Sequence, residues 1–235
     1  MRDEEIDDIL KQASAAAAPT PAPELLRRVA ESIRPTLRPV RPLWPAWLLS
    51  TALVLVCAAV SFVGAARVGL FGFAKMDSIE RVFILFTLAT LLTLFARALV
   101  AEMVPATPRR LSSGMLLLLA CIALAGMFAL LFHDYAIEQF VPIGINCLFT
   151  GMQHAIPAAL LSWLVVRRGF AINPVSAGLI AGALGGIAGV GMLELHCPNF
   201  EAAHLLVWHM AVVPLSAVLG AFAGWLIRFW SARSA

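Results

Sequence analysis

Residues able to bind a metal ion or undergo redox chemistry gather near the C-terminal end of the chain. Glu194, His196, Cys197, His204 and His209 fall in one stretch, which holds three of the five histidines and one of the four cysteines. Thiolate sulfur and imidazole nitrogen are the usual zinc ligands, and a reactive cysteine can also form a disulfide with a second thiol. The stretch is therefore a candidate metal, redox or structural site.

The composition is that of an integral membrane protein. Hydrophobic residues make up 61% of the 235 residues, charged residues only 13%, and the mean hydropathy is +0.88. Soluble domains carry about 25% charged residues, so an ordinary soluble domain is excluded and a lipid bilayer is expected around the chain. The net charge of +3 is too small to indicate direct binding of nucleic acid.

Six apolar segments are long enough to cross a bilayer, since a membrane-spanning helix needs about 20 residues. They cover Trp44–Ala66, Val82–Val104, Leu111–Phe132, Pro142–Val166, Pro174–His196 and Leu205–Trp230. We therefore expect an all-α integral membrane protein with six transmembrane helices in a bundle at residues 44–230. A tail at residues 1–43 precedes the bundle, and residues 231–235 form a short C-terminal end.

Glycines four residues apart mark the last two predicted spans. Gly178, Gly182 and Gly186 share one helix face, and Gly220 and Gly224 repeat the spacing in the sixth span. Small residues at this spacing let helix backbones approach closely inside a membrane. The pattern predicts tight packing within the bundle, with a homodimer face as the alternative.

The distribution of basic residues predicts the orientation. With both termini in the cytoplasm, the outer loops hold only Arg67, Lys75 and Arg81, whereas the tail, the inner loops and the C-terminal end hold most of the other lysines and arginines. Segments rich in Lys and Arg stay on the cytoplasmic side. We therefore expect a multi-pass protein of the bacterial inner membrane with both termini cytoplasmic.

The tail contains two short amphipathic stretches separated by prolines between Pro19 and Pro23. Their apolar faces combine residues at helical spacing: Ile6, Ile9, Leu10, Leu25, Leu26, Val29 and Ile33. Helices this short are marginal alone and fold best on a partner. The tail is therefore either a docking segment for a soluble protein or a loose tail with a basic membrane anchor.

Two cysteines fall at similar depth on the outer side of the predicted bundle. Cys147 lies just inside the fourth span, and Cys197 lies at the outer end of the fifth. They could form a redox-sensitive pair, or join His196 and His204 in binding a metal ion, although no local zinc-binding spacing is present. Hydrogen-bonded packing is the third interpretation, and no other cofactor is predicted.

Catalytic motifs are missing from the sequence. It contains no Gly-x-Ser-x-Gly elbow, phosphate loop or dinucleotide fingerprint, so we predict no catalytic residues and no enzyme. A small redox- or metal-dependent membrane enzyme that uses the outer Cys and His residues is the alternative hypothesis.

A series of motifs in the second half of the chain is similar to that of a known family. Cys147 is followed by His154-Ala-Ile-Pro157, by Arg167-Arg168-Gly, by Pro174 with the glycine repeat, by His196-Cys197-Pro198 and by Trp208. The order resembles the NrsF family, six-span negative regulators of extracytoplasmic-function sigma factors.

The resemblance implies a membrane-bound anti-sigma factor that regulates transcription in a stress response. The tail would hold the sigma factor away from RNA polymerase, and the membrane domain would sense an envelope, redox or metal signal. The family's paired cysteines would correspond to Cys147 and Cys197. The tail is longer than expected, and His209 stands where an aromatic residue is expected after Trp208.

Overall fold

The computed structural model describes residues 23–33, 44–103, 111–135, 137, 139–166 and 173–233. The chain divides into two compact units, Met1–Pro42 and Leu43–Ala235. The described part of the first unit is one helix, α2 (Pro23–Ile33). In the second unit the described residues form helices only: α3 (Ala46–Val68), α4 (Phe71–Lys75), α5 (Ser78–Ala101), α6 (Ser113–Leu131), α7 (Phe140–Val166), α8 (Pro174–His196), α9 (Ala202–His204), the π-helix η2 (Leu205–His209) and α10 (Met210–Arg233).

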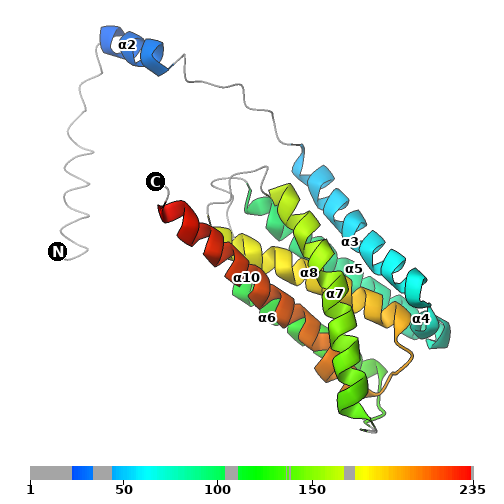
Figure 1. Cartoon of the computed structure of the whole chain (residues 1–235). Coiled ribbons are helices and arrows are strands. Elements are labelled where there is room, and N and C mark those ends of the chain that lie inside the picture. Colours follow the sequence, from blue (N-terminus) through cyan, green and yellow to red (C-terminus); the bar gives the residue numbers. More distant parts are fainter. Residues whose placement is uncertain are drawn as a thin grey trace, which may run out of the picture. The chain divides into compact units, whose positions relative to one another are not determined.

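Six helices of the described chain are long and apolar enough to cross a membrane. They are α3, α5, α6, α7, α8 and the continuous run α9–η2–α10 (Figure 1). The all-α prediction with six membrane-spanning helices is therefore confirmed. The fifth span matches its predicted bounds, whereas the second begins at Ser78 instead of Val82 and the sixth at Ala202 instead of Leu205.

Polar caps explain where several of these helices begin. The Asp77 side chain accepts a hydrogen bond from the backbone N–H of Glu80, and the Glu80 side chain accepts one from the N–H of Asp77. Ser112 and Asn173 cap α6 and α8 in the same way, by accepting from backbone N–H groups of the first turn. These caps satisfy donors that an apolar helix start leaves unpaired.

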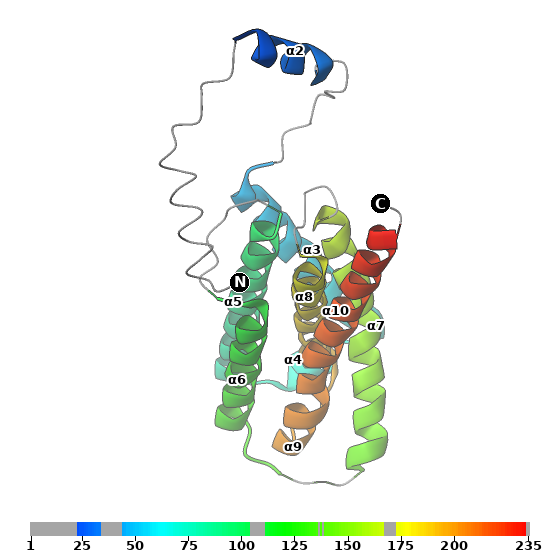
Figure 2. The ribbon, with the colours of Figure 1, turned by 90° about the vertical axis from the view of Figure 1, so that its left-hand side faces the viewer.

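Helix α8 is the central element of the bundle. In the most apolar 18-residue stretch of α8, 89% of the residues are buried. In the corresponding stretches of the other five spans the buried share is 22–39%. It contacts all five other membrane-length helices, and in Figure 2 it lies between the α5–α6 pair and the α7 and α10 helices. A helix this rich in glycine and alanine can be surrounded closely because it has few side chains to exclude its neighbours.

The glycine faces of α8 and α10 pack against each other. A Cβ atom added at Gly178 would strike the carbonyl oxygen of Gly220, one at Gly182 that of Ser216, and one at Gly224 that of Pro174. The predicted packing within the bundle is therefore confirmed for this face.

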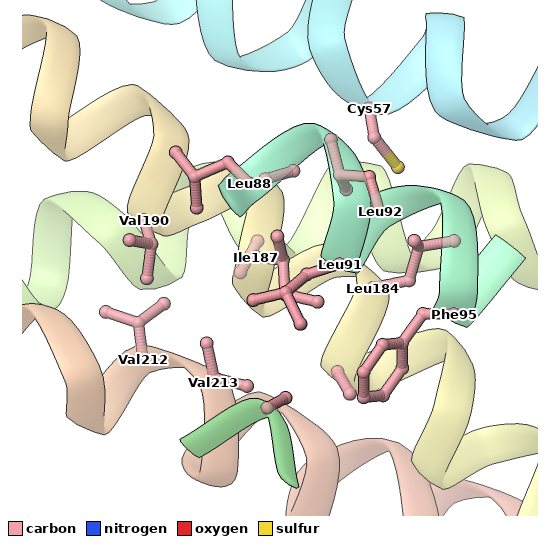
Figure 3. Packing of buried hydrophobic residues seen from close by; sticks show 14 of the residues in the cluster. Cys57, Leu88, Leu91, Leu92, Phe95, Leu184, Ile187, Val190, Val212 and Val213 are labelled. Atoms are coloured by element: carbon pink, nitrogen blue, oxygen red, sulfur yellow. The ribbon is translucent and has the colours of Figure 1, made fainter. Parts of the chain in front are cut away.

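Larger side chains from α5, α8 and α10 also pack around α8. Figure 3 shows Leu88, Leu91, Leu92 and Phe95 of α5 gathered with Leu184 and Ile187 of α8 and with Val212 and Val213 of α10. These residues are almost fully buried and form one continuous cluster. Close backbone contacts and this cluster of larger side chains therefore hold α8 together in the bundle.

We expect Gly182→Ala to destabilise the bundle and Gly126→Ala not to. The new methyl at residue 182 would meet backbone atoms of α10, which cannot rotate away, whereas the space beside Gly126 is open within 4 Å. Overpacking costs about 1–3 kcal/mol. Thermal unfolding of the two purified variants in detergent measures the difference. Equal melting temperatures would contradict the close contact between α8 and α10.

Helix α2 presents charge and apolar side chains to solvent. Arg27 donates to the Glu24 carboxylate over 2.9 Å, and this hydrogen bond lowers the pKa of Glu24. Of the predicted docking residues, Leu26 and Val29 are 54% and 46% exposed. Ile6, Ile9 and Leu10 lie outside the described residues, as do the side chains of Leu25 and Ile33.

Candidate functional site

One end of the bundle, here called the α4 end, holds the predicted site residues. At this end α4 packs against the loop that joins α8 to α9. Lys75 Nζ donates to the Pro198 carbonyl oxygen over 2.9 Å, and Gly72 lies so close to the carbonyls of Glu194 and Cys197 that a Cβ atom would strike them. The short helix therefore fixes the backbone around Cys197.

The two predicted cysteines meet at this end. Cys147 of α7 and Cys197, the residue that caps α8, place their sulfur atoms 3.5 Å apart. Both are free thiols, Cys197 buried and Cys147 partly buried. The hydrogen bond with Cys147, followed by burial, raises the pKa of the Cys197 thiol. Residues 50 positions apart in sequence are thus brought together by the contact between α7 and α8.

Two histidines complete the group. His204 Nε2 lies 3.8 Å from the Cys197 sulfur, and the rings of His204 and His209 meet edge-on with centroids 5.0 Å apart. One ligand atom from each of Cys147, Cys197, His204 and His209 lies within 4.8 Å of all the others. The chain thereby forms a compact set of two sulfur and two nitrogen ligands, which we call the Cys/His cluster.

The π-helix η2 brings the two histidines to the same side. The backbone N–H of Met210 donates to the Leu205 carbonyl, five residues earlier. In a regular α-helix, positions five apart diverge by about 140° around the axis, whereas the wider π turn reduces this divergence. His204 and His209 can therefore both face α7 and α8.

Glu194 holds His209 through a short hydrogen bond. Its Oε1 accepts a hydrogen bond of 2.6 Å from His209 Nδ1, and the two side chains are 1% and 0% exposed. Four buried side-chain polar atoms of the described chain lack a hydrogen-bond partner, and all belong to this stretch: Glu194 Oε2, His204 Nδ1, Trp208 Nε1 and His209 Nε2. Buried polar atoms are seldom left unpaired, so this concentration indicates a site that takes a further group.

The remaining Cys and His residues lie apart from the cluster. His196, predicted as a ligand, directs its Nδ1 to the Gly69 carbonyl oxygen at 2.9 Å, and His209 stands in the cluster instead. His154 bonds the Thr150 carbonyl in its own helix, and Cys57 is buried in α3 with Ser162 as its neighbour. The predicted ligands Cys147, Cys197 and His204 are thus brought together and His196 is not.

A comparison with family models identifies the chain. The model described as negative regulator of sigma F, NrsF, matches residues 35–230. The chain belongs to the NrsF family. The match covers the NrsF bundle from α3 to residue 230 of α10, including the Cys/His cluster, and begins after α2. No curated protein and no solved structure matches the chain. Since NrsF is a negative regulator of a sigma factor, membership supports an anti-sigma role.

Proposed function

We propose that the protein is a membrane-bound anti-sigma factor. It holds an extracytoplasmic-function sigma factor inactive through the tail at residues 1–43 and releases it when the Cys/His cluster receives an envelope, redox or metal signal. The observation that carries the proposal is the NrsF match over residues 35–230. The protein acts by binding, without catalysis.

The proposed orientation of the protein in the membrane rests on the distribution of its basic residues. Arg67, Lys75 and Arg81 are the basic residues of the connections at the α4 end, whereas Arg228 and Arg233 end α10 and further arginines precede α3. The rule that basic loops stay inside then places the α4 end outside the cytoplasm of an inner membrane. The Cys/His cluster would face the oxidising compartment, and the tail would face the sigma factor.

The tail has the properties of a docking segment. Leu26 and Val29 of α2 are exposed, and Glu24, Arg27 and Arg28 form an ion-pair group on the same helix. A helix of 11 residues is marginal in water, so a groove on a partner would stabilise it by covering its apolar face.

The bundle offers a route for the signal. The Cys/His cluster joins the ends of α7, α8 and α9–η2, and α8 contacts every other membrane-length helix. A ligand or bond formed at the cluster would favour one packing of these helices over another, which is how a local event can shift a two-state protein.

The alternative of a redox- or metal-dependent enzyme uses the same residues. It needs a reacting group that a substrate can reach, but Cys197, His204 and His209 are buried, and only Cys147 is partly open. This burial favours a sensor over a catalyst.

The proposal is tested by co-purification. Full-length protein expressed together with each extracytoplasmic-function sigma factor of its own organism is expected to retain one of them through purification. A variant that lacks residues 1–33 keeps the basic segment before α3 and should insert in the membrane but lose the sigma factor. The proposal fails if the full-length protein binds no sigma factor, or if the shortened variant binds it equally well.

A further inference from the structure

We propose that Cys147, Cys197, His204 and His209 bind one zinc-like divalent cation, with Glu194 orienting His209. The inference builds on the proposed function by naming the ligand of the same site. The proposed site has four ligands from three segments of the chain. The cysteine pair alone would provide only two ligands.

The distances suit a tetrahedral ion. Zn–S bonds of about 2.3 Å and Zn–N bonds of about 2.0 Å place two sulfur ligands about 3.8 Å apart and a sulfur and a nitrogen about 3.5 Å apart. The Cys147 and Cys197 sulfurs are 3.5 Å apart, and Cys197 Sγ is 3.8 Å from His204 Nε2. Small side-chain rotations would therefore complete the coordination.

Unpaired atoms distinguish a metal ion from a disulfide. A disulfide would consume the two sulfurs and leave His209 Nε2 buried without a partner. A metal ion would take this nitrogen as its ligand, because the other ring nitrogen already donates to Glu194. The cation thus accounts for a buried atom that the disulfide leaves unexplained.

The Glu194–His209 pair has the form of an outer coordination shell. Metal-binding histidines usually donate their second ring N–H to a carboxylate or carbonyl, which fixes the tautomer and directs the free nitrogen to the metal. His209 Nδ1 donates to Glu194 over 2.6 Å with both side chains buried. Glu194 is therefore a positioning residue, since it acts on the ion through His209.

The ligand types define the class of cation. Two thiolates and two imidazoles suit zinc and softer ions such as cadmium, whereas magnesium and calcium prefer oxygen ligands. A pocket of about 320 Å³, lined by Cys147, Asn146, Cys197 and Asn199 among others, adjoins the cluster. Binding would displace the thiol protons and so strengthen as pH rises.

Cobalt binding to purified full-length protein tests the inference. In detergent and under reducing conditions, we expect one Co²⁺ per chain, with the visible bands of a tetrahedral site and thiolate charge-transfer absorption, displaced by Zn²⁺. Glu194→Gln should weaken binding by about 10- to 100-fold, and His209→Gln by at least as much. His154→Gln is the matched control and should bind as wild type does, because this ring bonds the Thr150 carbonyl of its own helix and lies outside the cluster.

Two further comparisons show whether a loss of metal binding reflects misfolding, and whether the metal site and the proposed function fail independently. Cys147→Ser leaves the buried Glu194–His209 pair in place and should still weaken binding and reduce the charge-transfer band. No Co²⁺ bound to the wild type, or equal affinity in wild type, His209→Gln and Cys147→Ser, would overturn the inference. These measurements use no sigma factor. Metal-loaded protein that keeps its sigma factor would contradict the metal signal of the proposed function and leave the metal site standing.

Discussion

Replacing Ile6, Leu10, Leu26 and Val29 together by asparagine is expected to release the sigma factor fully in cells that receive no signal. Each apolar side chain buried in an interface contributes about 1.5 kcal/mol or more. Four together reach the roughly 5.5 kcal/mol that moves an equilibrium from 99:1 to 1:99. A reporter gene under a promoter that depends on the sigma factor measures the change as constitutive expression.

The effect should be confined to the tail. The described residues of the bundle form a separate unit, so the amount of protein in the membrane should equal that of the wild type. Glu31→Gln on α2 alters an exposed side chain away from the apolar face and should preserve repression. Reporter expression that stays low in the fourfold variant, with protein levels unchanged, would show that these apolar residues do not hold the sigma factor.

Cys147→Ser and Cys197→Ser are each expected to abolish most of the response to an inducing metal or thiol oxidant. Serine nearly preserves the size of the side chain but removes the thiolate that would bind a soft cation or form a disulfide. Formation of that disulfide would pass two electrons to the oxidant and release two protons. The induction ratio of the same reporter, with and without the inducer, gives the measurement.

Cys121→Ser provides the control for this experiment. Cys121 is a free cysteine in α6 that lies outside the Cys/His cluster, so its variant should respond as the wild type does. All three serine variants should insert in the membrane normally. If Cys147→Ser and Cys197→Ser also respond normally, the two cysteines serve only in packing.

Features that depend on local sequence could be predicted. The six spans follow from hydropathy, which is a property of each segment taken alone. The contact between α8 and α10 follows from glycines at a spacing that exposes the backbone on one face. The approach of Cys147 to Cys197 was also predictable, because membrane depth leaves few positions where two such residues can meet.

Features that depend on departures from regular helix could not be predicted. His209 joins His204 where η2 widens the helix to a π turn, whereas the normal helical period places positions five apart on different faces. His196 turns to Gly69 because the chain after α3 folds back as α4, inside a segment that reads as a polar break. Glu194 pairs with His209, 15 residues later, and no local spacing in the sequence indicates this contact.

The most direct test of the account measures sigma-factor release across the membrane domain. The full-length complex, reconstituted in lipid discs open on both faces, is exposed separately to Zn²⁺ and to a thiol oxidant, and the bound sigma factor is quantified. We predict that at least one of them dissociates the sigma factor from the wild type but not from Cys197→Ser. A sigma factor that stays bound to the wild type under both treatments would contradict the account.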